Sequence, residues 1–234
     1  MRTCAALLSL SLSLPSLAAP GVEIVPRATW DPDPPDVGAL SRTGAAVRYQ
    51  GPLERALSWI VVHHSDFTDA PGPLAIKRYH LDVSGFSDIG YHFVIAKDGT
   101  VYEGRHLSLM GAHAGASREQ VRALVKLRKE GKKGRELDEA WQQDPDHGAI
   151  GIVLDGYFFG QRPTAAQQRS LALLVEELMG RYGIARDHVI THREVKPRVV
   201  EASGRALYGE ETVCPGDELQ AVVDVLRALL PGTP

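Results

Sequence analysis

Two short and almost wholly apolar segments constrain the fold of this chain more than any other feature. They cover residues 59–64, W-I-V-V-H-H, and residues 149–154, A-I-G-I-V-L. Runs of this length that are rich in β-branched residues predict strands, and their lack of a polar face indicates that the strands are buried. Such strands need helices to cover them, so we expect a layered fold of helices on a central sheet.

The strongest helix signal lies between residues 164 and 183. Thr164 followed by Gln167 forms a capping box at its start, and Gly183 is a typical stop signal at its end. The apolar side chains in between recur at helical spacing; they are Leu171, Leu174, Val175, Leu178 and Tyr182. We therefore predict an amphipathic helix that packs one face on the sheet.

Weaker patterns supply the remaining elements. They predict a strand over 189–191, a helix over 218–230 and a short helix over 73–81. The side chains of the short helix expected to face partly inward are Leu74, Ile76, Tyr79 and Leu81. Because strands alternate with helices, the predicted class is α/β, with a mixed central β-sheet flanked by α-helices in a single domain with surface insertions.

A β-hairpin is predicted over residues 91–104. Asp98-Gly99 lies there between two apolar stretches. An Asp-Gly pair in this setting is the favoured two-residue hairpin turn, in which both central residues take a positive φ. Tyr91 is thus expected at the start of the hairpin.

The N-terminal residues predict export. A positively charged start is followed by an apolar stretch and then by small residues, which is typical of a signal peptide over residues 1–18. The alternative, a buried N-terminal helix of the folded domain, fits these residues less well, because the stretch has no polar face. Residues 19–56 are rich in proline and glycine without a sustained period, so we expect an irregular N-terminal arm. The main domain is expected over 57–234, in a secreted or periplasmic protein.

Composition argues against two other classes of protein. The apolar leader is too short for a stable membrane span, and no other segment is long and apolar enough to form one. The net charge of −3 argues against a general electrostatic grip on nucleic acid. We therefore expect no nucleic acid partner and no membrane span, and we expect a monomer.

Three side chains suited to zinc stand at places where sites are usually built. His63 lies at the end of the first strand, His192 follows the strand over 189–191, and Cys214 precedes the last helix. Two imidazoles and one thiolate leave a fourth position open for water, as in catalytic zinc sites. His63 and His64 point to opposite faces of their strand, so only one can reach a given metal, and strand geometry leaves the choice open.

Removal of the leader would take Cys4 away and leave Cys214 as a single thiol. In an oxidising compartment such a thiol has three interpretations: a buried inert side chain, an intermolecular disulfide or a metal ligand. The histidines outside this set are expected to be packed or hydrogen-bonded; they include His80, His106, His147 and His188.

Several motifs, taken together and in order, resemble the N-acetylmuramoyl-L-alanine amidase type 2 family. Phage-lysozyme-like amidases and peptidoglycan recognition proteins share this fold. The motifs are W-I-V-V-H-H-S, D-I-G-Y-H-F-V-I-A-K-D-G-T-V-Y-E-G-R, G-A-H-A-G, I-G-I, T-H-R-E-V and T-V-C-P-G. Each is weak alone, but their joint occurrence in this order is specific. The resemblance covers roughly residues 57–230.

The resemblance implies a Zn²⁺ ion held by His63, His192 and Cys214. It also implies hydrolysis of the amide bond between N-acetylmuramic acid and the L-alanine of the peptidoglycan stem peptide. The expected partner is therefore peptidoglycan or a muropeptide. One alternative is a catalytically inactive recognition protein, and another is a structural wall-anchoring protein without a metal. The enzyme is favoured because inactive relatives typically lack the cysteine.

Further roles follow from the same resemblance. Tyr91 corresponds to the catalytic tyrosine of the family, and its hydroxyl is a candidate donor to the oxyanion that develops during amide hydrolysis. Thr212 is a second candidate, since in an extended run its hydroxyl would share a face with Cys214. His113 resembles a histidine near the substrate groove.

Two segments are expected to be insertions. Residues 117–147 combine helical spacing with many lysines and arginines, which predicts a solvated basic helix; a contact surface for the wall polymer is the weaker alternative. Residues 197–211 are expected to form a surface loop or, alternatively, a cover over the groove.

Overall fold

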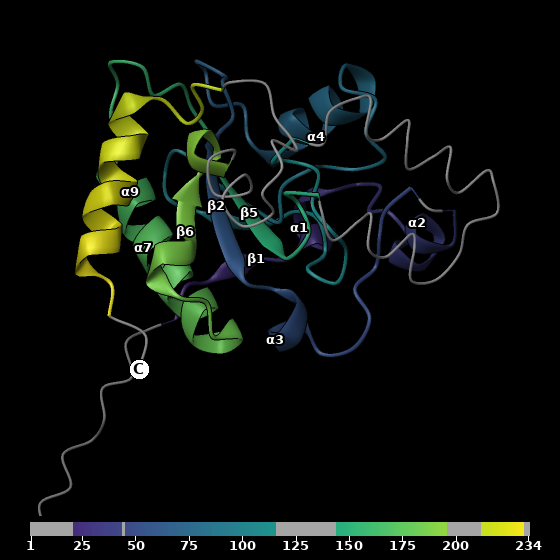
Figure 1. Cartoon of the computed structure of the whole chain (residues 1–234). Coiled ribbons are helices and arrows are strands. Elements are labelled where there is room, and N and C mark those ends of the chain that lie inside the picture. The colour runs from purple at the N-terminus through teal and green to yellow at the C-terminus, as the bar shows by residue number, and fades with distance from the viewer. Residues whose placement is uncertain (1–20, 44, 116–143, 196–211, 232–234) are drawn as a thin grey trace, which may run out of the picture.

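The computed structural model describes residues 21–43, 45–115, 144–195 and 212–231. Six strands form one sheet in the order β1-β4-β3-β5-β2-β6. The neighbours β3 and β4 are antiparallel, whereas the other neighbouring pairs are parallel. Figure 1 shows this mixed sheet with helices around it. The predicted fold class is confirmed.

The two strongly apolar segments occupy neighbouring positions inside the sheet. β2 (Trp59–His64) lies between β5 (Ala149–Leu154) and β6 (Val189–Thr191) and runs parallel to both. Every residue of β5 is buried, as is every residue of β2 after Trp59. The three strands are therefore confirmed with the bounds expected from the sequence.

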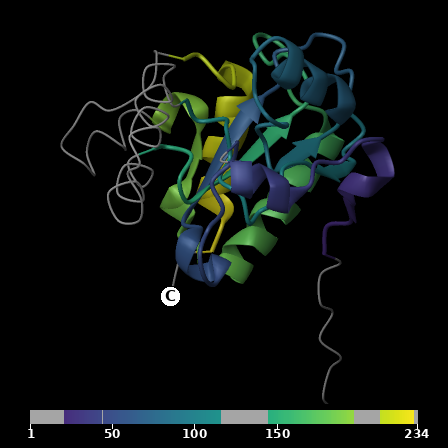
Figure 2. The ribbon, with the colours of Figure 1, turned by 90° about the vertical axis from the view of Figure 1, so that its right-hand side faces the viewer.

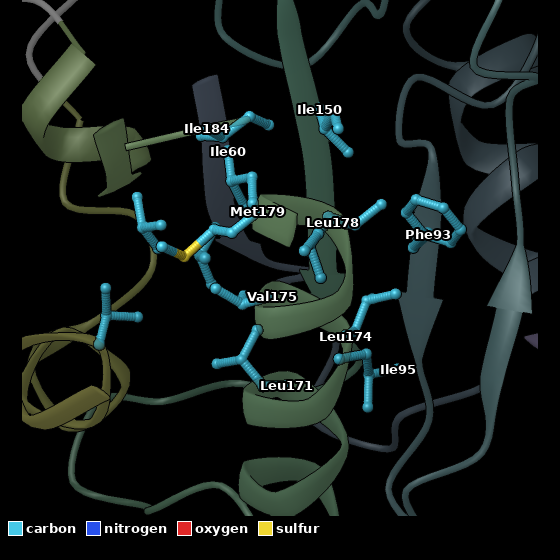
Figure 3. Packing of buried hydrophobic residues seen from close by; sticks show 14 of the residues in the cluster. Ile60, Phe93, Ile95, Ile150, Leu171, Leu174, Val175, Leu178, Met179 and Ile184 are labelled. Carbon is cyan, nitrogen blue, oxygen red and sulfur yellow. The ribbon is translucent and has the colours of Figure 1, made fainter. Parts of the chain in front are cut away.

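Helices α7 (Ala165–Tyr182) and α9 (Asp217–Leu229) cover one face of the sheet. Leu174 of α7 lies in the same buried cluster as Ile60 of β2 and Phe93 of β3, and Figure 3 shows these side chains converging between helix and sheet. The apolar stripe predicted for α7 is the part of the helix that is buried. This cluster is the main hydrophobic core.

The ends of α7 are formed as the sequence predicts. The Thr164 hydroxyl accepts the backbone N–H of Gln167 at 3.1 Å, and the Gln167 side chain accepts the backbone N–H of Thr164 at 3.1 Å. Gly183 ends the helix with a φ of 65°. Both capping signals are thus confirmed.

Helix α4 (Pro73–Asp82) lies on the opposite face of the sheet. Its Ile76 packs with Val94 of β3 and Val153 of β5 in a second cluster, separate from the one under α7. In Figure 2 the molecule is turned so that the side carrying α4 faces the viewer. The helix predicted over 73–81 is confirmed, one residue longer.

One side chain of α4 does not face inward as predicted. Tyr79 is 47% exposed, whereas His80, the next residue, is buried and accepts the backbone N–H of Gly90 at 2.9 Å through its Nδ1 atom. Neighbouring residues of a helix point in different directions, so burial of His80 turns Tyr79 outward. The prediction of a hydrogen-bonded His80 is confirmed.

The predicted hairpin consists of β3 (Phe93–Ile95) and β4 (Val101–Glu103), but its turn differs from the expected one. Ala96 accepts the backbone N–H of Gly99 at 2.8 Å and donates its own N–H to Thr100 at 2.9 Å. The loop therefore has three residues, and among them only Gly99 takes a positive φ, of 91°. A type I turn followed by a left-handed glycine is the next most common hairpin loop.

The segment expected to be an irregular arm contains regular structure. It holds β1 (Ile24–Val25), which pairs in parallel with β4, and three short helices. These are α1 (Arg27–Trp30), α2 (Val37–Thr43) and α3 (Leu53–Ala56). The segment is therefore part of the sheet and of the domain, and the prediction of an irregular arm was wrong.

Buried ion pairs attach this segment to the sheet. The Arg27 guanidinium donates to Asp31 and Asp88, each at 2.7 Å, and to the carbonyl of Gly104 at 2.6 Å. Lys77 of α4 donates to Asp31 at 2.8 Å. A buried charge is tolerated only when it is paired and hydrogen-bonded, and here each charged group has such partners.

Several predictions fall outside the described residues. They are the signal peptide, most of the basic helix over 117–147 and the loop over 197–211. The described end of the basic segment, residues 144–148, forms a turn that leads into β5. Within the described ranges, no helix combines the length and the apolar character needed to cross a bilayer.

Candidate metal centre

The parallel arrangement of β2 and β6 brings two histidines together. His63 is the last residue but one of β2, and His192 follows β6 directly. Because neighbouring parallel strands end at the same edge of a sheet, the two side chains meet there, with ring centroids 4.6 Å apart. Cys214 joins them, and the candidate ligand atoms of the three residues all lie within 4.8 Å of one another.

Cys214 is held in place by hydrogen bonds on both sides. The backbone N–H of Arg193, next to His192, donates to the Cys214 carbonyl at 2.9 Å. The Cys214 N–H donates to the hydroxyl of Thr212 at 3.1 Å. Helix α9 begins three residues later, and its Leu219 is fully buried in the main core. The packing of α9 therefore fixes the thiol next to the strand ends.

The structure separates the two histidines of β2. His63 is completely buried and its Nδ1 atom lies 3.8 Å from the Cys214 sulfur. The ring of His64 points elsewhere and packs near Tyr157 and Phe159, with centroid distances of 6.2 Å and 5.6 Å. The alternation of side chains along a strand left both open, and the position of Cys214 selects His63 for the three-residue cluster.

Burial determines the protonation of the cluster. Burial, and then the neighbouring His192 and His113, lower the pKa of His63 well below its usual 6.5. Burial lowers the pKa of His192 to about 4 and raises the pKa of the Cys214 thiol to about 12. Both imidazoles are thus neutral at pH 7, the state that binds metals. Two neutral imidazoles and a thiol are a donor set that fits zinc, whose binding would displace the thiol proton.

Tyr91 stands beside the cluster. It directly precedes His92 and β3, and its ring centroid lies 5.1 Å from that of His63. Its carbonyl accepts the backbone N–H of Arg105 at 2.8 Å, which ties it to the other strand of the hairpin. Burial, and then the nearby Cys214, raise the pKa of Tyr91. The phenol therefore keeps its proton and remains a hydrogen-bond donor.

Thr212 does not lie in an extended run. Its hydroxyl accepts the N–H of Cys214, two residues later, which forms a turn closed by a side chain. The turn thus replaces the extended run on which the shared face of Thr212 and Cys214 depended, and the role of Thr212 as a second donor to the oxyanion stays a prediction. What the structure does show is that Thr212 supports the backbone of Cys214.

His113 lies beside His63, next to the three-residue cluster. Its side chain is completely buried. Its Nδ1 atom lies 3.0 Å from the Nε2 atom of His63, on the side of His63 that faces away from Cys214. Burial, and then the neighbouring His192, lower its pKa to about 3. The structure thus shows His113 in contact with His63, and its place near a substrate groove stays a prediction.

Two buried acids behind His113 were not singled out from the sequence. Asp146 accepts the backbone N–H groups of His113 and Ala114 through one oxygen, at 2.9 Å and 2.7 Å. Asp144 accepts the N–H of Asp146 at 2.9 Å, and its other oxygen has no hydrogen-bond partner among the described residues. The signal in the sequence was a pair of acidic residues just before a buried strand. Acidic residues are rarely buried without a partner, so such a pair points to a special environment.

The acid pair predicts a pH-dependent stability. Burial raises the pKa of both carboxyl groups above 3.8, and repulsion from Asp146 raises that of Asp144 further. An acid with a raised folded-state pKa stabilises the fold at low pH and loses this contribution as the pH rises. We expect Asp144→Asn to stabilise the metal-free protein by on the order of 1–2 kcal/mol more at pH 8 than at pH 5. Urea unfolding at both pH values measures this, and an equal difference at both would contradict it.

Comparison with known proteins agrees with the geometry. A family model described as N-acetylmuramoyl-L-alanine amidase matches residues 53–217. Peptidoglycan-recognition protein SC2 of Drosophila simulans is 36% identical over 116 residues, which are 47% of this chain and 56% of that protein. The chain thus spans little more than half the length of this curated relative.

Solved structures show the same fold. The endolysin N-acetylmuramoyl-L-alanine amidase LysCS from Clostridium intestinale superposes with a TM-score of 0.51 and 26% identity, covering 77% of this chain and 92% of that one. The Drosophila peptidoglycan recognition protein SD gives a TM-score of 0.58 at 22% identity, covering 91% and 97%. With the family match spanning most of the sheet and the three-residue cluster, the chain belongs to the N-acetylmuramoyl-L-alanine amidase family.

Proposed function

We propose that this protein is an active, zinc-dependent N-acetylmuramoyl-L-alanine amidase. Its reaction would be hydrolysis of the amide bond between the muramic acid lactyl group and the first L-alanine of the stem peptide. The observation that carries the proposal is the convergence of His63, His192 and Cys214 within 4.8 Å. A protein that only binds the wall has no use for two neutral imidazoles and a thiol gathered at one point.

His63, His192 and Cys214 would hold the zinc ion and leave one position free for water, as catalytic sites do. When bound, zinc polarises the scissile carbonyl and lowers the pKa of a water molecule. The surrounding residues hold the candidate ligands in place. The hydrogen bond from Arg193 to the Cys214 carbonyl and the packing of α9 keep the thiol next to the ends of β2 and β6.

Tyr91 would stabilise charge that develops on the substrate. Its raised pKa keeps the hydroxyl protonated at neutral pH, so it can donate a hydrogen bond to an oxyanion. It lies two residues before β3, and its carbonyl accepts the N–H of Arg105 just after β4, so its backbone is attached to both strands of the hairpin. A preorganised donor of this kind is worth more than a flexible one, because it needs no rearrangement during the reaction.

The location follows from the substrate and from the N-terminal residues. We propose that the protein is secreted or periplasmic, because residues 1–18 have the composition of a signal peptide and the proposed substrate lies outside the cytoplasm.

The test combines metal content with wall digestion. We expect purified protein to bind one zinc ion per chain and to release new L-alanine amino termini from purified peptidoglycan. Elemental analysis and amino-terminal labelling measure the two. Protein that binds the wall but releases no amino termini, with zinc present, would favour the recognition protein instead. Protein without zinc affinity would contradict the metal site.

A further inference from the structure

The two ring nitrogens of His63 face different neighbours. Nδ1 lies 3.8 Å from the Cys214 sulfur, and Nε2 lies 3.0 Å from Nδ1 of His113. The nitrogen available to a metal is therefore Nδ1. A neutral imidazole carries one proton, and a nitrogen that binds a metal cannot hold it. In the metal-binding state the proton of His63 must reside on Nε2, where His113 meets it.

His113 is held so that it can accept this proton in a hydrogen bond. One carboxylate oxygen of Asp146 accepts the backbone N–H groups of His113 and Ala114. Two glycines make room for the ring, since a Cβ atom at Gly111 or Gly151 would lie 2.4 Å or 2.3 Å from its Cδ2 atom. Both the backbone and the ring of His113 are thus fixed in position.

A neutral imidazole at His113 suits the role of acceptor. One of its two nitrogens carries a proton and the other has a free lone pair. The oxygen of Asp146 that lies 3.4 Å from Nδ1 is the one already engaged by the two backbone N–H groups. Nδ1 of His113 can therefore accept from His63, while Nε2 of His113 keeps the proton.

A purely structural reason for His113 is weak. Its Nε2 is buried and has no hydrogen-bond partner among the described residues. A buried polar group without a partner costs on the order of 1–3 kcal/mol, and an apolar side chain of similar shape would avoid that cost. The histidine is thus a poor packing residue and a well-placed acceptor.

We propose that His113 is a positioning residue of the metal centre: it accepts the Nε2 proton of His63 and so keeps Nδ1 of His63 unprotonated and directed toward Cys214. Asp146 supports this arrangement by fixing the backbone of His113. The inference rests on the proposed function in that it requires a metal at the cluster. Groups that orient a ligating histidine typically contribute 10- to 100-fold to metal affinity.

Two variants of nearly the same shape test this. Leucine and asparagine both branch at Cγ, but only asparagine offers an acceptor atom near the position of Nδ1. We expect His113→Leu to weaken zinc binding by roughly 10- to 100-fold and His113→Asn to bind at least about fivefold more tightly than His113→Leu. Competition with a chromogenic chelator measures the affinities, and urea unfolding of the metal-free proteins is measured in parallel.

The stability measurement separates positioning from packing. Asparagine buries an unpaired amide and leucine does not, so the metal-free His113→Leu protein should be at least as stable as His113→Asn. The proposal is supported if His113→Asn binds zinc more tightly than His113→Leu while being no more stable than it. Wild-type affinity in His113→Leu, or equal losses in both variants, would overturn it while leaving the amidase proposal intact. Absence of zinc binding in the wild type would instead overturn the proposed function, and this inference with it.

Discussion

Replacement of Cys214 by alanine should remove both zinc binding and amidase activity. The variant loses one of the three candidate ligands, and only the two imidazoles of His63 and His192 remain to bind the metal. We expect the loss of zinc affinity to exceed the roughly 10- to 100-fold that the loss of a supporting residue costs. Release of L-alanine amino termini should fall below detection. Elemental analysis after dialysis and amino-terminal labelling measure the two effects.

Two further variants make this result specific. Cys214→Asp supplies a carboxylate, which also binds zinc, and should retain more zinc than Cys214→Ala. His188→Ala removes a histidine at the opposite end of β6 from His192 and should keep full zinc content. Circular dichroism checks that all three proteins are folded. A folded Cys214→Ala protein with wild-type zinc content would show that the thiol is not a ligand.

The parts of the fold that could be predicted from the sequence are those with a local cause. β2 and β5 are buried on both faces, so every position favours an apolar residue and the run is visible without knowing its partners. The ends of α7 are equally local, since Thr164 and Gln167 bond to each other.

The parts that were missed depend on distant partners. β1 has two residues, too few for a periodic pattern, and it exists because β4 lies beside it. Arg27 is buried because Asp88 and the carbonyl of Gly104 meet it from another part of the chain. The turn at Gly99 differed from the prediction because an Asp-Gly pair is compatible with both a two-residue and a three-residue loop.

The same distinction applies to the candidate site. His192, Cys214 and the pair His63 and His64 could be named because they stand at the end of a strand or before a helix, where the local sequence is recognisable. The choice of His63 over His64 came from the family resemblance, and the structure places His63 in the cluster. The place of His113 could not be derived in this way. It depends on the small size of Gly151, in a strand that begins far along the chain, and on the carboxylate of Asp146. A family resemblance indicates that a histidine matters, but packing decides which neighbour it touches.

Substitution of Tyr91 by phenylalanine should lower kcat by on the order of 100-fold or more while zinc content stays unchanged. The change removes one hydroxyl and leaves the ring, whose centroid lies 5.1 Å from that of His63. Loss of one preorganised donor to an oxyanion typically costs 100- to 1000-fold in kcat. Because the donor acts mainly in the transition state, KM should change little.

Measured kcat, KM and zinc content together distinguish this role from others. Tyr182→Phe removes a hydroxyl from α7, on the other face of the sheet, and should leave all three quantities unchanged.

The raised pKa of Tyr91 means that its proton is present throughout the neutral range, so wild type and Tyr91→Phe should show the same pH dependence of kcat below pH 9. A Tyr91→Phe protein that retains wild-type kcat would show that the hydroxyl is not needed, and the oxyanion would then be stabilised by the metal and other donors. A loss of zinc in this variant would instead mean that Tyr91 supports the packing of His63.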